Sequence, residues 1–264
     1  MLHDAEVFED RFITQRSIDT INRAHDAGMQ FAIATARPVS TGLQFAEKLP
    51  VDAVIYLNGA LIDFDPAHSD FDLLTSGATP ADENHLIKIG FSSRRACEVC
   101  LFLLDRMPGL KLGIVMNDVD PDYVIAGETN TYNYQTILKA VDLINKGARL
   151  IATNSDLTGP SEQGIIPACR ALVSPIELAT GKTAYYVGKP NPLMMRTGLR
   201  LLGVHSHEAA MIGDRMDTDI VAGIETGLDT VLVLSGCTTR KDVENYAYRP
   251  HFILDGVGCI PPQA

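Results

Sequence analysis

IGDRMDTDIVAGIETGLDTVLVLSG, residues 212–236, is the stretch that decides the fold. It joins two apolar runs, AAMIGD (209–214) and DTVLVLSG (229–236), through a short helix that is expected to end at Gly227. Continuous apolar runs of this length are typical of strands that are buried on both faces. A buried strand, a helix and a second buried strand in succession predict a parallel sheet, with Asp214 just beyond the carboxyl end of the first strand.

The same alternation of strand and helix extends through most of the chain. Thr14 to Gly28 predicts a helix with Thr14 as N-cap and Gly28 as its end, and the apolar run 29–35 predicts a buried strand that ends at Thr35. A helix over about 40–48 and a strand over 51–59 follow. The fold class expected is α/β, a Rossmann-type parallel sheet with covering helices.

A second series of elements interrupts this core. Strands or helices are expected at 85–91, around Cys97, and at 110–118, 121–128, 134–146 and 148–154, and residues 155–168 are expected to form a loop. We therefore predict a core made of residues 1–80 and 181–264, with an inserted α/β cap domain of residues 81–180.

Composition excludes several classes of partner. The formal net charge is −11 and Lys and Arg are not clustered, so nucleic acid and anionic membrane partners are electrostatically disfavoured. No apolar run approaches the roughly 20 residues that cross a bilayer, and no secretion signal opens the sequence.

Five cysteines without framework spacing fit reduced thiols, which predicts a cytoplasmic protein. Cys97 and Cys100 form a C-x-x-C, for which thiols buried on a helix are favoured over a zinc or redox site.

Three polar residues follow predicted strands and could form a phosphate site. Thr35 ends the run ATARP, Lys189 follows TAYYVG, and Asp214 follows AAMIG. In parallel sheets, ligands bind beyond the carboxyl ends of the strands, so these residues are expected at one rim of a shared sheet. Thr35 would supply a hydroxyl, Lys189 a positive charge and Asp214 an oxygen ligand suited to Mg²⁺.

Each residue also has a simpler explanation. An Asp after a strand is often a turn or helix-cap residue, as Asp217 and Asp219 are in a position to be. A Lys before Pro is usually solvated, and Thr35 could satisfy only a backbone group at the strand end. The occurrence of all three at strand ends, in this order, favours the phosphate site.

The C-terminal half resembles the NagD-like branch of the haloacid-dehalogenase-type (HAD) phosphatases. The resemblance rests on VGKPNP (187–192) and the stretch 212–236, and it extends upstream through PDYVIAGETNTYNY (121–134), INKGARLIATNSD (144–156) and GIIPACRAL (164–172). It implies that Lys189 stabilises the phosphoryl group and the nucleophile, that Asp214 binds Mg²⁺ and that Asp219 supports the metal loop. Residues 155–170 would belong to the substrate-facing part of the cap.

The N-terminal part resembles the Cof-type branch of the same superfamily. IDTINRAHDAGMQFAIATARP (18–38) and LPVDAVIYLNGALI (49–62) carry this similarity, as do HLIKIGF and IVMND within 85–118. The resemblance makes Thr35 the second-motif hydroxyl. The expected phosphate-binding set is then Thr35, Ala36, Arg37, Lys189 and Arg215. The two resemblances meet near residues 117–121.

The first motif of the family is not found. HAD enzymes attack phosphate with an aspartate in a D-x-D-G-T run that ends their first strand, whereas this sequence opens MLHDAEVFEDRFITQRS. Asp4 and Glu6 are the spaced carboxylates nearest the start; they are either a displaced substitute or, as we favour, part of a solvated loop together with His3. The family places its first strand between the strands ending at Thr35 and Asp214, so its loss would leave two inner sheet edges.

The function expected is therefore a magnesium-dependent phosphatase of a small phosphate monoester, in the nucleotide or sugar phosphate class, impaired because the nucleophile is missing. The main alternative is an inactive HAD-like protein or truncated chain that at most binds a phosphorylated metabolite. A phosphomutase or dehalogenase is a weaker alternative. Exposed sheet edges would favour a homo-oligomer.

Overall fold

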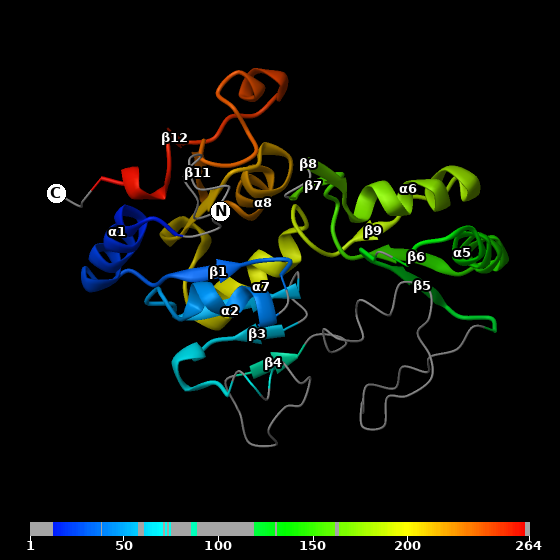
Figure 1. Ribbon diagram of the computed structural model, residues 1–264, viewed down its shortest axis with the longest axis horizontal. Helices are drawn as coiled ribbons and strands as arrows, with labels where there is room; N and C mark the ends of the chain where they lie inside the picture. The colour runs from blue at the N-terminus through cyan, green and yellow to red at the C-terminus, as the bar shows by residue number, and fades with distance from the viewer. Residues whose placement is uncertain are drawn as a thin grey trace. The chain divides into compact units, whose positions relative to one another are not determined.

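The protein folds into two compact units, formed by Met1–Gly90 with Lys189–Ala264 and by Phe91–Gly188 (Figure 1). The computed structural model describes residues 13–37, 39–57, 61–70, 72, 74, 86–88, 119–129, 131–161 and 164–261. The predictions made for His3, Asp4, Glu6, Cys97 and Cys100 lie outside these residues. No helix of the described residues is long and apolar enough to cross a membrane.

In the part of the first unit that the structure describes, two sheets form the centre. The first sheet has the order β1-β2-β3-β4, in which β1 and β2 are parallel and the other pairs are antiparallel. Its strands are Ala32–Ala34, Ala53–Tyr56, Leu61–Asp63 and Leu86–Lys88. The second sheet has the order β10-β11-β12 and is entirely parallel. Its strands are Ala210–Gly213, Asp229–Val233 and Phe252–Leu254.

Both sheets contribute to the same two core layers. On one face, Ala34 of β1 and Met211 of β10 belong to the cluster that includes Met194 and Ala222 of the covering helices α7 (Pro192–Leu202) and α8 (Val221–Thr226). On the other face, the next residue of each strand, Ile33 and Ile212, belongs to the cluster under α1 (Gln15–Asp26). Since neighbouring strand residues point to opposite faces, the unit is a three-layer α/β/α structure.

The local sequence explains where the helices of this unit begin. The Thr14 hydroxyl accepts a hydrogen bond from the Ser17 backbone N–H at 3.2 Å, so the predicted N-cap of α1 is confirmed. Asn191 caps α7 by accepting from the Leu193 N–H at 3.0 Å, with Pro192 at the first helical position. Helix α2 (Val39–Ala46) packs its first residue into a further cluster with β2 and β3.

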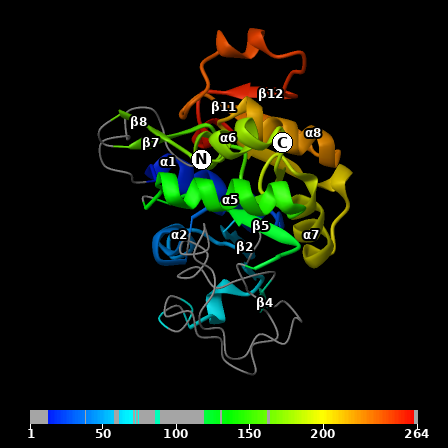
Figure 2. The ribbon, with the colours of Figure 1, turned by 90° about the vertical axis from the view of Figure 1, so that its right-hand side faces the viewer.

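The second unit is a smaller α/β layer. Its strands β5 (Tyr123–Ala126), β6 (Arg149–Ala152) and β9 (Tyr185–Tyr186) form a parallel sheet. Helices α5 (Tyr134–Lys146) and α6 (Cys169–Thr180) share one hydrophobic cluster on one face of it and pack together, as Figures 1 and 2 show. The Lys182 ammonium donates to the carbonyl of Ile144 at the end of α5, at 2.6 Å.

Three segments differ from the sequence prediction. Residues 155–168 were expected to form a loop, but they contain the hairpin β7 (Thr158–Ser161) and β8 (Gly164–Pro167). A two-stranded ribbon tolerates prolines because each strand has an unpaired edge. Strand β4 pairs with β3 in the first unit, although its segment was expected in the cap, because β3 offers an antiparallel edge. Strand β9 pairs with β6 in the second unit, although it was expected in the core.

The core of the second unit can be tested with two substitutions on α5. Ile144 is fully buried in the cluster that α5 and α6 share, whereas Leu138 on the same helix is 47% exposed. Ile144→Ala should lower the free energy of unfolding by about 2–5 kcal/mol, and Leu138→Ala by less than about 0.5 kcal/mol. Urea unfolding of the purified variants checks this difference, and equal losses would contradict the assigned faces of α5.

Candidate active site

Asp214 lies where the sequence predicted, directly after β10. The residue is only 2% exposed, and its carboxylate oxygen Oδ2 accepts a hydrogen bond from the Cys237 backbone N–H at 2.8 Å. The Asp214 carbonyl accepts from the Thr238 N–H at 3.1 Å. Because β10 and β11 are parallel neighbours, the loops that follow them lie together, and these bonds fasten one loop to the other.

The Asp219 carboxylate holds the backbone of the loop that follows β10. It lies in a π-helical turn, Met216–Ile220, and is 4% exposed. Its Oδ2 accepts from the backbone N–H groups of Asp214 and Arg215, both at 3.2 Å, and its Oδ1 accepts from the Lys189 ammonium at 2.7 Å. Both carboxylate oxygens therefore hold protein groups, which fits the supporting role inferred for Asp219.

Lys189 contributes a basic side chain that is partly shielded from water. The chain re-enters the first unit at this residue, and its side chain is 20% exposed. Burial alone would raise the pKa of Asp219, but the Lys189 ammonium and the hydrogen bonds from Lys189 and the Arg215 backbone outweigh burial and lower that pKa. The site therefore holds a buried, ionised pair.

Two glycines, which the sequence reasoning did not single out as site residues, make room for the two aspartates. A Cβ on Gly213 would lie 2.2 Å from the Asp219 Cβ, and a Cβ on Gly236 would lie 2.1 Å from Asp214 Oδ2. Both distances are far below a van der Waals contact, so a side chain at either position would displace a carboxylate. Their positions in I-G-D and S-G-C, next to strand ends, were the available sequence signal.

The Arg215 side chain is directed at Asp217. Its Nε donates to Asp217 Oδ1 at 3.0 Å and its Nη2 donates to Oδ2 at 2.8 Å, which is a two-pronged pairing. The role in phosphate binding expected for Arg215 stays a prediction. The structure adds that this guanidinium braces the turn that carries Asp219.

Thr35, Ala36 and Arg37 form a turn at the end of β1. The Thr35 hydroxyl accepts from the Arg37 N–H at 3.1 Å, and the Thr35 N–H donates to the carbonyl of Ile55 at 2.9 Å. The hydroxyl thus satisfies a local backbone group, as its simpler explanation required. A further contact of these residues with phosphate stays a prediction.

The expectation that the three site residues share the rim of one sheet stays a prediction. Among the described residues, Thr35 follows a strand of the first sheet, Asp214 a strand of the second, and Lys189 a strand of the second unit. Lys189 and Asp214 are nevertheless brought together, because each contacts Asp219.

The described residues fit one carboxylate ligand for a hard cation. A buried carboxylate suits Mg²⁺, and Mg²⁺ usually keeps several waters and few protein ligands. Within residues 13–261 as far as they are described, no group of three or more His, Cys, Asp and Glu side chains could hold a metal ion. A cation bound after β10 would have Asp214 as its direct carboxylate ligand, with Asp219 holding the backbone next to it.

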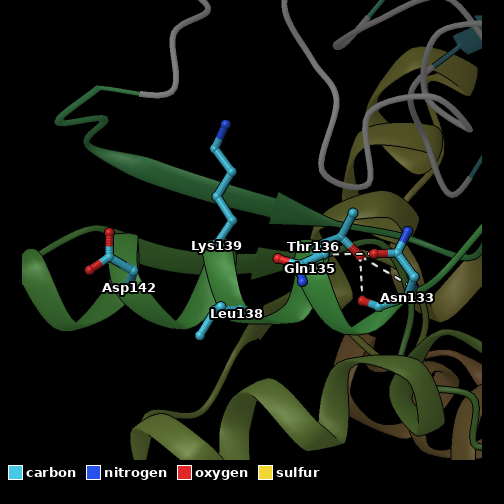
Figure 3. A pocket seen from close by; sticks show the side chains of 6 residues that line it. All are labelled: Asn133, Gln135, Thr136, Leu138, Lys139 and Asp142. Carbon is cyan, nitrogen blue, oxygen red and sulfur yellow. Dashed lines mark hydrogen bonds between the residues drawn. The ribbon is translucent and has the colours of Figure 1, made fainter.

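A separate hollow of about 770 Å³ lies in the second unit along α5 (Figure 3). It is lined by Asn133, Gln135, Thr136, Leu138, Lys139 and Asp142. Asn133 and Thr136 form the capping box of the helix, and Asp142 pairs with Lys146 at 2.6 Å. These polar groups cap the helix and stabilise its surface.

The fold and this site define the class of protein. A family model described as haloacid dehalogenase-like hydrolase matches residues 7–158, more than half of the chain, and a second, described as HAD-hydrolase-like, matches residues 186–259. The chain belongs to the haloacid dehalogenase-like hydrolase family, so the resemblance described from sequence is confirmed.

Among curated relatives, the chain is 47% identical over 148 residues to dihydroxyacetone phosphatase of Corynebacterium glutamicum. The matched stretch covers 56% of this chain and 54% of that protein. The chain is 44% identical over 150 residues to ribonucleotide monophosphatase NagD of Escherichia coli, which covers 57% of this chain and 59% of that one. The chain thus spans little more than half the length of these relatives.

Solved structures share the fold over almost the whole chain. NagD from E. coli superposes with a TM-score of 0.64 at 29% identity and covers 97% of this chain and 95% of its own. A thermostable NPPase double mutant from Geobacillus stearothermophilus gives a TM-score of 0.69 at 26% identity and covers 96% and 94%. The prediction of a HAD-like core with an α/β cap is confirmed at the level of the fold.

The packing of Gly236 against Asp214 predicts a sharp difference between two glycine substitutions. Gly236→Ala should destabilise the first unit by about 2 kcal/mol or more, because its Cβ would overlap the Asp214 side chain. Gly159→Ala in β7 is the matched control, since its Cβ would meet Ile166 at an ordinary 3.8 Å. Thermal unfolding of both variants measures the difference, and an unchanged Gly236→Ala protein would contradict the close approach.

The Lys189–Asp219 pair predicts a stability loss that depends on pH. Asp219→Asn leaves a shielded ammonium without its carboxylate and should cost about 3 kcal/mol at pH 7. The folded-state pKa of Asp219 is lowered, so its stabilisation is complete above the unfolded pKa of about 4 and is lost as pH falls through the folded-state pKa. Urea unfolding from about pH 3 to about pH 7 should show the stabilities of the two proteins converging in acid.

The control is an exposed pair with nearly the same geometry. Lys146 and Asp142 lie 2.6 Å apart, but their side chains are 63% and 55% exposed. Asp142→Asn should therefore change the free energy of unfolding by less than about 0.5 kcal/mol. Similar losses for the two Asp→Asn variants would show that the Lys189–Asp219 pair is not shielded as described.

Proposed function

We propose that this chain performs phosphatase chemistry on a small phosphate monoester, with Mg²⁺ held at Asp214. The observation that carries the proposal is the array Lys189–Asp219–Asp214 beyond β10. It offers a cationic group and a buried carboxylate that Asp219 holds together, which are the groups that binding a phosphate with its cation requires.

The roles of the chain's own residues follow from these contacts. Asp219 fixes the Lys189 ammonium and the backbone of Asp214, so both side chains are oriented before a substrate arrives. Asp214 would hold Mg²⁺ through a carboxylate oxygen, and Lys189 would lie next to the phosphate. When bound, the cation would neutralise charge on the phosphate oxygens. Thr35, with Ala36 and Arg37, would supply the hydroxyl and backbone donors of the same pocket.

The substrate class is inferred from the relatives. One is named dihydroxyacetone phosphatase and another ribonucleotide monophosphatase. We propose a phosphate ester of a sugar-like or nucleotide metabolite for this chain. We further propose that the first unit is the core and the second the cap, with the β7–β8 hairpin in its substrate-facing part. The cytoplasmic location and the homo-oligomer stay predictions.

The lack of an identified nucleophile lowers the rate of phosphate ester hydrolysis that we expect. The printed sequence contains no D-x-D-G-T run, and the described residues do not identify another carboxylate for the attack. We therefore propose that this 264-residue polypeptide binds Mg²⁺ and phosphate but turns substrate over slowly. The same observation favours the second candidate, a HAD-like protein that binds a phosphorylated metabolite without hydrolysing it.

Magnesium binding and hydrolysis of p-nitrophenyl phosphate test the proposal together. The wild-type chain should bind Mg²⁺ in calorimetry, and any turnover should require Mg²⁺. Asp214→Asn should reduce both by about 100-fold or more, because it removes the direct ligand. Asp142→Asn, on the exposed face of α5, is the control and should leave both unchanged.

The outcomes separate the two candidates. Slow turnover that is lost in Asp214→Asn supports the enzyme, whereas magnesium binding without turnover supports the binding protein. An added N-terminal strand that ends in D-x-D-G-T should raise turnover of the enzyme by about 100-fold or more, since it supplies the nucleophile. A wild-type chain that does not bind Mg²⁺ would overturn the proposed site.

A further inference from the structure

The side chain of Arg215 is held by its partner Asp217. The two hydrogen bonds, at 3.0 and 2.8 Å, fix both the position and the orientation of the guanidinium, whose side chain is 16% exposed. The Asp217 side chain is 40% exposed, so the pair lies at the edge of the protein. The fork ties Arg215 to the turn that follows Asp214.

The backbone of Arg215 is tied to the same turn. Its N–H donates to Asp219 Oδ2 at 3.2 Å, and its carbonyl accepts from the N–H groups of Asp219 and Ile220 at 3.1 and 3.0 Å. The residue is thus bound to the π-helical turn through its side chain, its N–H and its carbonyl. A change in the guanidinium would be transmitted to the carboxylates on either side of it.

A second segment braces the turn from outside. The segment between β11 and β12, drawn in orange in Figure 1, carries Tyr248, whose hydroxyl donates to the carbonyl of Met216 at 2.9 Å. The Tyr246 and Tyr248 rings lie 5.4 Å apart. Burial, followed by the charge of Asp217, raises the pKa of Tyr246, while Arg215 lowers it, so this ring lies within electrostatic reach of the Arg215–Asp217 pair.

The loop after β11 is tied to the residue that precedes Arg215. The Cys237 N–H donates to Asp214 Oδ2 at 2.8 Å, and the Thr238 N–H donates to the Asp214 carbonyl at 3.1 Å. The start of the turn is therefore fixed from the neighbouring loop as well.

We propose that Arg215 is a positioning residue: it clamps Asp217 and holds the turn from Asp214 to Asp219 in the geometry that a divalent cation needs. The substrate phosphate is bound by other groups. The inference rests on the proposed function, because it assigns the clamp to the same magnesium site. Mg²⁺ demands near-ideal octahedral geometry, so a small displacement of its carboxylate ligand weakens binding.

The test changes each partner of the Arg215–Asp217 pair in the full chain. Calorimetry measures binding of Mg²⁺ alone, and then of inorganic phosphate at saturating Mg²⁺. The variants are Arg215→Lys, Arg215→Met, Asp217→Asn and the double variant Arg215→Met/Asp217→Asn. Each single variant should weaken Mg²⁺ binding by about tenfold, as supporting residues of metal sites do. The double variant should be little worse than either single one, because both remove the same interaction. Phosphate affinity at saturating Mg²⁺ should change less than about twofold.

Arg23→Lys is the control for any general effect of replacing an arginine with a lysine. Arg23 lies on α1, where its guanidinium donates to the Thr20 hydroxyl. Circular dichroism shows whether each variant folds, and Arg215→Lys retains the charge if Arg215→Met does not fold. Two results would overturn this inference and leave the proposed function standing. One is an unchanged Mg²⁺ affinity in the folded Arg215 and Asp217 variants. The other is a phosphate affinity that falls tenfold in the Arg215 variants but not in Asp217→Asn. A wild-type chain that does not bind Mg²⁺ overturns the proposed function and the inference with it.

Discussion

The site depends on the hydrogen bonds that the Asp219 carboxylate accepts. One oxygen accepts from the Lys189 ammonium at 2.7 Å, and the other accepts from two backbone N–H groups of the loop after β10. A buried charge of this kind is costly unless its partners satisfy it, so the three donors and the carboxylate hold one another in place. Asp219 thereby fixes where the chain re-enters the first unit at Lys189, and it fixes the backbone of Asp214.

Much of this could be predicted from short-range sequence signals. The N-cap Thr14, the glycine at Gly28 and the apolar runs that end at Thr35 and Asp214 depend on neighbours within a few residues, so the pattern determines α1, β1 and β10 to within a few positions. The family resemblance extended this to Lys189, which lies 30 positions before Asp219, its partner.

Long-range pairings could not be predicted in the same way. Strand β4 is only three residues long, and its place follows from the edge that β3 offers, which no local pattern encodes. The pairing of Arg215 with Asp217 depends on the extended backbone of Arg215, which lies just before the π-helical turn, whereas residues two apart within a helix do not face each other. The need for glycine at 236 likewise arises from a carboxylate 22 positions earlier in the chain.

Charge decides how the proposed magnesium site would work. Asp217 pairs with Arg215 and Asp219 with Lys189, and Asp214 accepts a hydrogen bond from the Cys237 backbone N–H at 2.8 Å. The chain as a whole carries a formal net charge of −11, so long-range forces repel a phosphate, and they are screened beyond about 8 Å in physiological salt. Attraction must then arise within the site, where Lys189 is already shared with a carboxylate. A divalent cation at Asp214, as proposed, would reverse the local sign of charge, and it would then bind before the phosphate.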